Sequence, residues 1–139
     1  MNKKFLLTWL AIFIVWMVGS FIVHGAPLES DYLKVPQLFR TAEESKPYFP
    51  LMLLAHILLS GAFVWIYARG IAPRPCLGQG IRFGFAVALL TTAPTYLIYF
   101  VVQAMPAMLV AKQIVFDGLL LLVLGAVTAF VYRGQALAQ

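Results

Sequence analysis

Asp117 lies in "KQIVFDGLLLL", residues 112–122, a stretch that is otherwise almost entirely apolar. A carboxylate in the hydrocarbon of a bilayer is costly, so such groups usually mark ion paths, substrate sites or paired polar contacts. We keep three interpretations open. Asp117 binds a proton or cation with His56 as its partner, or it accepts hydrogen bonds from Tyr96, Tyr99 or His56 and locks the helices together. The third is local pairing with the lysine or glutamine that begins the stretch.

Several other polar side chains fall at the depth of Asp117 when each helix is counted from its basic end. At a rise of about 1.5 Å per residue, they lie about 20 to 26 Å from that end. The members of this polar layer are Ser20, His56, Tyr96, Tyr99 and Asp117. Secondary members, placed by three- and four-residue spacing on the same helix faces, are Thr92, Gln103 and His24. Because polar faces avoid lipid, we predict that these residues meet inside a bundle, as a binding or packing layer.

The two histidines raise the question of a metal or haem site. A pair of histidines facing each other between helices is one way to hold haem. Counted from Lys4, however, His24 lies about 30 Å along its helix and thus well above His56. Zinc would require a third or fourth ligand at suitable spacing, and the sequence offers none. We therefore expect neither haem through His24 and His56 nor any other cofactor or metal.

The elements that must position this layer are membrane spans. The chain has 139 residues, of which 63% are hydrophobic and 11% charged, whereas soluble domains carry about 25% charged residues. A span needs about 20 mostly apolar residues. The stretches that qualify are 5–23, 49–68, 83–105 and 108–132, with a polar outer loop at 24–48. We predict an all-α, four-helix transmembrane bundle that forms one domain, residues 1–139, with the first apolar run retained rather than cleaved as a signal peptide.

The basic residues predict the orientation of this bundle. One side carries six basic residues and no acidic ones: Lys3, Lys4, Arg69, Arg74, Arg82 and Arg133. The other side mixes lysines and an arginine with acids. The positive-inside rule then places both termini in the cytoplasm. Because the positive charge sits at span ends rather than in one run, we expect the lipid bilayer, and not nucleic acid, as the partner.

Within the predicted spans, a proline and several small residues are expected to shape the helices and their packing. Pro94 is expected to kink the third span, with Thr91 or Thr92 bonding to carbonyls near the break. Small residues are expected to let helices approach each other: Gly61, Gly84, Ala88, Gly118 and Gly125.

In the outer loop we predict a short helix from Pro36 to about Glu44, with an ion pair between Arg40 and Glu44. The loop is either a connector on the membrane surface or a lid or docking patch.

Motifs of known enzymes are missing from the sequence. It contains no GxSxG, P-loop or HExxH pattern, and "GQGIRFG" is interpreted as a glycine-rich turn that does not follow a strand. Cys76 is the single cysteine, expected in a cytoplasmic loop, so an internal disulfide or a CxxC redox pair is excluded. We therefore do not expect an enzyme.

Four segments together resemble a known group of proteins: "VHGAPLESDY", "LMLLAHILLSGAFVWIYARG", "LGQGIRFGFAVALLTTAPTYLIYF" and "VAKQIVFDGLLLLVLGAVTAFVYR". The chain resembles small four-helix bacterial membrane proteins grouped as a domain of unknown function. The resemblance implies a multi-pass protein of the bacterial inner membrane and supplies no activity. Our leading hypothesis is a structural or accessory component that packs with itself, as a homo-oligomer, or with a larger membrane complex. The alternative is a small proton- or cation-linked transporter built around Asp117 and His56.

Overall fold

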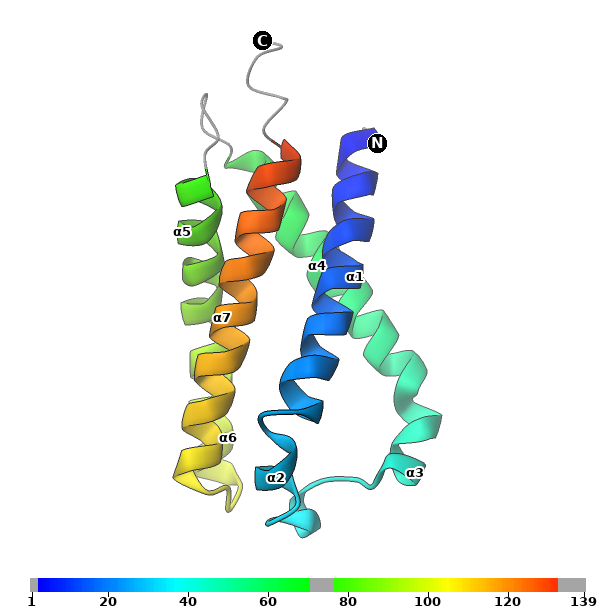
Figure 1. Cartoon of the computed structure of the whole chain (residues 1–139), viewed down its shortest axis with the longest axis vertical. Coiled ribbons are helices and arrows are strands. Elements are labelled where there is room, and N and C mark those ends of the chain that lie inside the picture. The colour runs from blue at the N-terminus through cyan, green and yellow to red at the C-terminus, as the bar shows by residue number, and fades with distance from the viewer. Residues whose placement is uncertain (1–2, 71–76, 133–139) are drawn as a thin grey trace.

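The chain folds into helices over nearly all of its described length (Figure 1). The computed structural model describes residues 3–70 and 77–132, and none of these residues lies in a β-strand. Four helical stretches are long and apolar enough to cross a membrane: Lys3–Gly25, Pro36–Arg69, Leu77–Val102 and Ala107–Tyr132. The all-α, four-helix prediction is therefore confirmed, and the helices indicate a multi-pass membrane protein.

Three predicted spans agree with the helices to within about two residues, whereas the third begins earlier than predicted. Helix α1 covers Lys3–Gly25, α4 covers Phe49–Arg69 and α7 covers Ala107–Tyr132. The third stretch consists of α5 (Leu77–Val87), the π-helix η3 (Ala88–Thr92) and α6 (Ala93–Val102). It thus starts at 77 rather than 83 and ends at 102 rather than 105. The segment "GQGIRFG" lies within α5, so its interpretation as a turn was wrong.

The glycines of α5 allow the backbones of α5 and α7 to come into contact. A Cβ atom added to Gly84 would lie 2.2 Å from the carbonyl oxygen of Leu121, and one added to Gly80 would lie 2.1 Å from that of Gly125. Only glycine allows so close an approach of two helix backbones. The contact confirms the predicted role of Gly84 and Gly125, whereas a Cβ added to Gly118 would meet nothing within 4 Å. The four-residue spacing of Gly80 and Gly84 was the signal that sequence reasoning missed.

The third stretch changes its helical form just before Pro94. The π-helix η3 ends at Thr92, and α6 then begins with Pro94 in its first turn. Thr91 donates a hydrogen bond from Oγ1 to the carbonyl oxygen of Val87 at 2.8 Å, as predicted for a hydroxyl beside a helix irregularity. A single π-turn inside an α-helix is a common cause of helix distortion. The extra residue of a π-turn also moves the side chains that follow it to a different face of the helix.

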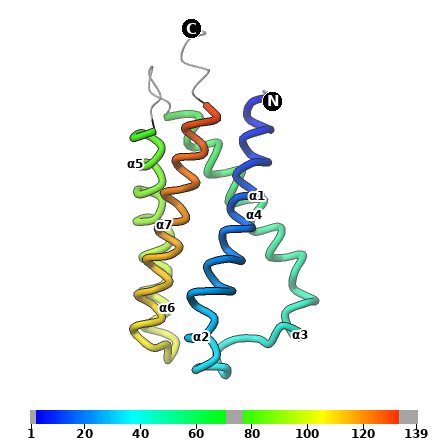
Figure 2. Tube along the Cα trace, in the orientation of Figure 1, coloured from blue at the N-terminus to red at the C-terminus, as the bar shows by residue number. Residues whose placement is uncertain are grey.

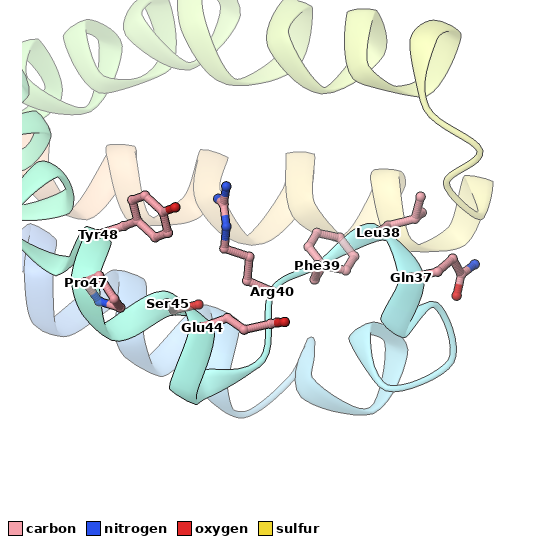
Figure 3. Close-up of a pocket in the computed structure, with 8 residues that line it drawn as sticks. All are labelled: Gln37, Leu38, Phe39, Arg40, Glu44, Ser45, Pro47 and Tyr48. Atoms are coloured by element: carbon pink, nitrogen blue, oxygen red, sulfur yellow. The ribbon is translucent and has the colours of Figure 1, made fainter.

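The connection between α1 and α4 contains short helices in place of the single one predicted. They are α2 (Glu29–Tyr32), η1 (Pro36–Leu38), α3 (Ala42–Ser45) and η2 (Lys46–Tyr48). The helix that begins at Pro36 ends at Leu38, because Thr41 caps α3 in a reciprocal capping box with Glu44. Arg40 lies over the ring of Tyr48, 4.3 Å from its centroid (Figure 3). Within the described residues no ion pair joins Arg40 to Glu44, so that prediction was wrong.

Helix α7 is the centre of the bundle. Helices α1, α5 and α6 pack against it, and α4 packs along α1. Helix α1 begins and α7 ends at the same end of the bundle, where α4 also ends (Figure 1). From there α4 crosses α1, and its N-terminal half leans away from α7 (Figure 2). The helices therefore converge at one end and spread at the other.

These two ends differ in their interior, and we name them by it. The closed half is the end built around Phe63, Tyr67, Phe83 and Tyr132, whose rings lie 4.7 to 5.8 Å apart between centroids. The open half is the end that carries the α1–α4 connection. In it, a second apolar cluster packs the connection onto the start of α7; its buried members are Leu28, Val35, Met105, Leu109 and Val110.

Candidate functional site

A polar cleft of about 300 Å³ lies in the open half, between all four membrane-length helices. Its walls include every member of the predicted polar layer: Ser20, His56, Tyr96, Tyr99 and Asp117. Of the secondary members, His24 and Thr92 also line it. Gln103 does not, because it follows the end of α6 and is exposed. The structure thus brings together residues from four helices that are far apart in the sequence.

Asp117 lies on α7 with its carboxylate directed at α6 and α1. Tyr96 donates a hydrogen bond from its hydroxyl to Oδ2 at 2.5 Å. The Nε2 atom of His24 lies 3.5 Å from Oδ1. The Asp117 side chain is 16% exposed, and His24 is the one cation-capable group within 4 Å of it among the described residues. The carboxylate is thus held in place without a lysine or arginine to neutralise it.

His24 connects Asp117 to the α1–α4 connection. Its Nδ1 atom lies 2.5 Å from the hydroxyl oxygen of Tyr32, and the two rings stack with centroids 5.9 Å apart. Gln113 donates a hydrogen bond from Nε2 to the same hydroxyl oxygen at 3.2 Å. Burial raises the pKa of Tyr32, so this hydroxyl keeps its proton at neutral pH.

The groups beside His24 lie in a row. The Tyr32 hydroxyl oxygen lies between Nε2 of Gln113, which donates to it, and Nδ1 of His24. The other ring nitrogen of His24, Nε2, faces Oδ1 of Asp117. Either nitrogen of an imidazole ring can carry the proton. Polar groups thus follow one another from Gln113 to Asp117.

The position of His24 differs from the depth predicted by counting residues. We expected it well above His56, yet both histidines line the same cleft. The count assumed parallel helices, but α4 crosses α1 at an angle, so equal lengths along two helices do not give equal depths. The sequence signal that indicated His24 was its spacing of four residues from Ser20 on the same face of α1.

His56 lies across the cleft and makes no hydrogen bond with Asp117. Its Nδ1 atom is 2.9 Å from the carbonyl oxygen of Met52, and its Nε2 atom is 3.4 Å from Oγ of Ser20. The ring of Trp16 packs against it edge-on, with centroids 6.4 Å apart. Of the three hydrogen-bond donors predicted for Asp117, only Tyr96 donates to it among the described residues; Tyr99 lines the cleft and is 44% exposed.

The lysine and glutamine near Asp117 have other partners. Lys112 donates from Nζ to Oδ2 of Asp31 at 2.6 Å, and Lys34 donates to Oδ1 of the same carboxylate at 2.9 Å. These two ammonium groups lower the pKa of Asp31 below its ordinary value of 3.8. The local pairing proposed for Asp117 is therefore replaced by an ion-pair triad that fastens α2 to α7. Sequence reasoning missed Asp31, which is only 7% exposed although it lies in a polar loop.

The side chains that could bind a metal do not cluster. Within residues 3–70 and 77–132, no group of three or more His, Cys, Asp or Glu side chains is placed to hold a metal ion. Each ring nitrogen of His24 and His56 has a polar neighbour from the protein itself, at 2.5 to 3.5 Å. The residue Cys76 lies outside the described residues.

Comparisons with protein-family models, curated proteins and solved structures gave no match to this chain. The resemblance to a family of small bacterial membrane proteins therefore stays a prediction.

Proposed function

We propose that this chain is a small proton- or cation-linked carrier whose binding group is the carboxylate of Asp117. One observation carries the proposal: this carboxylate faces a cleft of about 300 Å³ and has no lysine or arginine within 4 Å among the described residues. A partly buried charge is stable only with a compensating charge or proton. A proton or cation that enters the cleft supplies that compensation.

The surroundings of Asp117 favour binding over a purely structural role. A carboxylate that serves only to lock helices is expected to be enclosed by its donors, because an open cavity beside it forfeits packing contacts. Asp117 instead has a donor on one side, His24 on the other, and open space between them. Tyr32 and His24 lie in a row that ends at the carboxylate, with Nε2 of His24 3.5 Å from Oδ1, and a hydroxyl and an imidazole can each pass a proton along such a row.

The test is proton flux in proteoliposomes that contain the full chain and a pH-sensitive dye. With an imposed membrane potential, we expect the native protein to acidify or alkalinise the lumen faster than empty liposomes do. Asp117→Asn keeps the size and shape of the side chain but removes the charge, and should reduce flux to the level of empty liposomes. Glu43→Gln is the matched control, because Glu43 is exposed and pairs with Lys46 on the protein surface. Equal flux for Asp117→Asn and the native protein would contradict the proposal.

A structural or accessory role is the second candidate, and the position of α4 favours it. Helix α4 packs mainly on α1, and many of its other side chains, among them Leu51, Leu54 and Leu58, are exposed. Such a face contacts either lipid or another helix. Purification in a mild detergent followed by native mass spectrometry separates these outcomes. A homo-oligomer or a partner at fixed stoichiometry would support the accessory role, and a monomer would count against it.

We also propose that both termini are cytoplasmic and that the membrane is the bacterial inner membrane. The first part is supported by Lys3, Lys4, Arg69 and Arg82, which lie near the end of the bundle where α1 begins. The remaining basic residues of the prediction, Arg74 and Arg133, lie outside the described residues.

Thiol labelling of intact cells tests this orientation. In a Cys76→Ser background, Thr41→Cys should react with a membrane-impermeant maleimide, because Thr41 lies in the α1–α4 connection, which this orientation places outside. Gln79→Cys, near the start of α5, should react only after the cells are opened. The reverse pattern would overturn the proposed orientation.

A further inference from the structure

We propose that the cleft takes a lipophilic organic cation, which enters from the bilayer between α1 and α4. This inference rests on the proposed cation site at Asp117 and names the class of its ligand. It follows from three features: a second hollow that adjoins the cleft, the kinds of side chains that line the two, and the lack of a shared wall between the cleft and the pocket on the aqueous side.

An apolar groove of about 290 Å³ between α1 and α4 shares walls with the polar cleft. It is lined by Met17, Phe21, Gly25 and Met52, and by the three residues that it has in common with the cleft: Ser20, His24 and His56. A further hollow of about 580 Å³ shares Phe21 and Met52 with the groove and extends to α3 and η2. Phe21 is exposed on the surface of α1. The hollows therefore adjoin one another between the exposed surface of α1 and the cleft.

The chemistry of the lining changes in one direction from the groove to the cleft. The groove offers methionine and phenylalanine side chains, the shared wall offers two histidines and a serine, and the cleft offers Asp117. A ligand that fits all of it has an apolar body and a polar part that reaches Asp117. An apolar body also lets a molecule dissolve in the bilayer and approach the groove from the side.

The cleft selects a cation as the polar part. The rings of Trp16, Tyr96 and Tyr99 line it together with the carboxylate of Asp117, and aromatic faces attract cations that have lost their water. No lysine or arginine is among the described residues that line the cleft, so an anionic group would meet Asp117 without a counter-charge. A phosphate or carboxylate amphiphile is therefore disfavoured.

The aqueous side of the connection is a less suitable entrance for a cation. A pocket of about 920 Å³ lies there, and Arg40 points into it between Tyr48 and Phe39 (Figure 3). Arg40 and Glu44 both line this pocket, so its charges oppose each other, and none of the described residues that line it also lines the cleft or the groove. The groove between α1 and α4 carries no lysine or arginine among its described lining residues. Lys46 lines the hollow outside the groove, where it pairs with Glu43.

The test uses two ions of the same shape and opposite charge, tetraphenylphosphonium and tetraphenylborate. Binding of each ion to the full chain in nanodiscs is measured by equilibrium dialysis, with empty nanodiscs subtracted. We expect saturable binding of tetraphenylphosphonium, at least about tenfold tighter than that of tetraphenylborate. Asp117→Asn should weaken binding of the cation by about tenfold, equivalent to ~1.4 kcal/mol. Equal binding of both ions, or cation binding that Asp117→Asn leaves unchanged, would overturn the inference.

A pair of tryptophan variants tests the lateral path. Met52→Trp fills the groove with a larger side chain and should slow association of tetraphenylphosphonium by about tenfold. Leu54→Trp is the matched control, because Leu54 lies two residues along α4 and is 51% exposed away from the groove. If Met52→Trp binds the cation as fast as Leu54→Trp does, entry through the groove is wrong.

The flux and binding measurements distinguish a failure of the carrier proposal from a failure of the lipophilic-cation inference. If tetraphenylphosphonium does not bind but flux depends on Asp117, the lipophilic-cation inference is wrong and the proton carrier stands. If the cation binds through Asp117 but no Asp117-dependent flux is found, the inference stands as a binding site and the carrier is wrong.

Discussion

The closed and open halves of the bundle are built from the same helices but packed in opposite ways. In the closed half, α5 and α7 touch through their backbones at Gly80, Gly84 and Gly125, and the rings of Phe63, Tyr67 and Tyr132 fill the space beside them. In the open half, α4 leans away from α7, and the space holds a cleft lined by ionisable and hydroxyl side chains.

The contrast shows how a small membrane protein can hold a charged group at moderate depth. Close packing of backbones in one half holds α5 and α7 against each other. The other half is then free to hold Asp117 in a cavity, although a cavity contributes less to stability than a filled core. The closest backbone contacts and the ionisable side chains of the cleft therefore lie at different ends of the same helices. Substitutions in each half test this division.

The largest loss of stability is expected from a substitution in the closed half. Gly84→Leu places a side chain where even a Cβ atom would lie 2.2 Å from the Leu121 carbonyl oxygen. Helices α5 and α7 must separate, and we expect the free energy of unfolding to fall by about 2–3 kcal/mol. The melting temperature in detergent measures this.

Gly118→Leu is the matched control for that substitution. Gly118 lies on α7, one of the two helices in the contact, and a Cβ atom added there would meet nothing within 4 Å. Its melting temperature should stay close to that of the native protein. Equal losses at both positions would mean that backbone contact does not distinguish the closed half.

A smaller loss of stability is expected in the open half. Tyr96→Phe removes the hydrogen bond from the Tyr96 hydroxyl to Asp117 and leaves the ring in place. Hydrogen bonds between membrane helices contribute about 0.6 kcal/mol on average, so the free energy of unfolding should fall by about that amount. Tyr99→Phe is the control, because Tyr99 lines the cleft without a hydrogen bond to Asp117 among the described residues. A loss of more than about 2 kcal/mol for Tyr96→Phe would make this hydrogen bond a packing lock and weaken the contrast.

The smallest effect is expected at the edge of the open half, where Asp31 fastens α2 to α7. Its pKa is lowered below 3.8 by Lys112 and Lys34, so its contribution to stability is complete above that value. It is lost as the pH falls through the lowered pKa, because the protonated carboxyl no longer pairs with the lysines. Hydrogen exchange of the α2 segment should therefore rise on acidification below about pH 3.8, while exchange in the closed half stays slow.

Lys112→Met serves as the companion variant for this local effect. It should raise hydrogen exchange in α2 already at neutral pH, whereas Lys46→Met removes an exposed pair with Glu43 and should not. Exchange in α2 that is the same for both variants would mean that the triad does not hold the connection in place.

The sequence was sufficient to predict those features that depend on a single helix. Span positions follow from local hydropathy, and the polar layer follows from spacing on single helices, so the grouping of Ser20, Tyr96 and Asp117 could be predicted from the sequence alone. Contacts that depend on helix crossing were not predictable in this way. The approach of His24 to Asp117 requires the tilt between helices.

Contacts that depend on the loop were missed for a related reason. The Asp31–Lys112 pair joins residues 81 positions apart, and nothing in the local pattern brings α2 back onto α7. The break after Leu38 depends on the competition between a helix starting at Pro36 and the Thr41 capping box. Local signals of similar strength decide such competitions, so sequence rules predict the elements but not their ends.

The central claim is that Asp117 acts as a binding group and not as a lock between helices. Measuring proton flux and melting temperature on the same Asp117→Asn preparation tests it most directly. We predict flux at the level of empty liposomes and a melting temperature within a few degrees of the native protein. Native flux combined with a large fall in melting temperature would contradict the account and make Asp117 a structural lock.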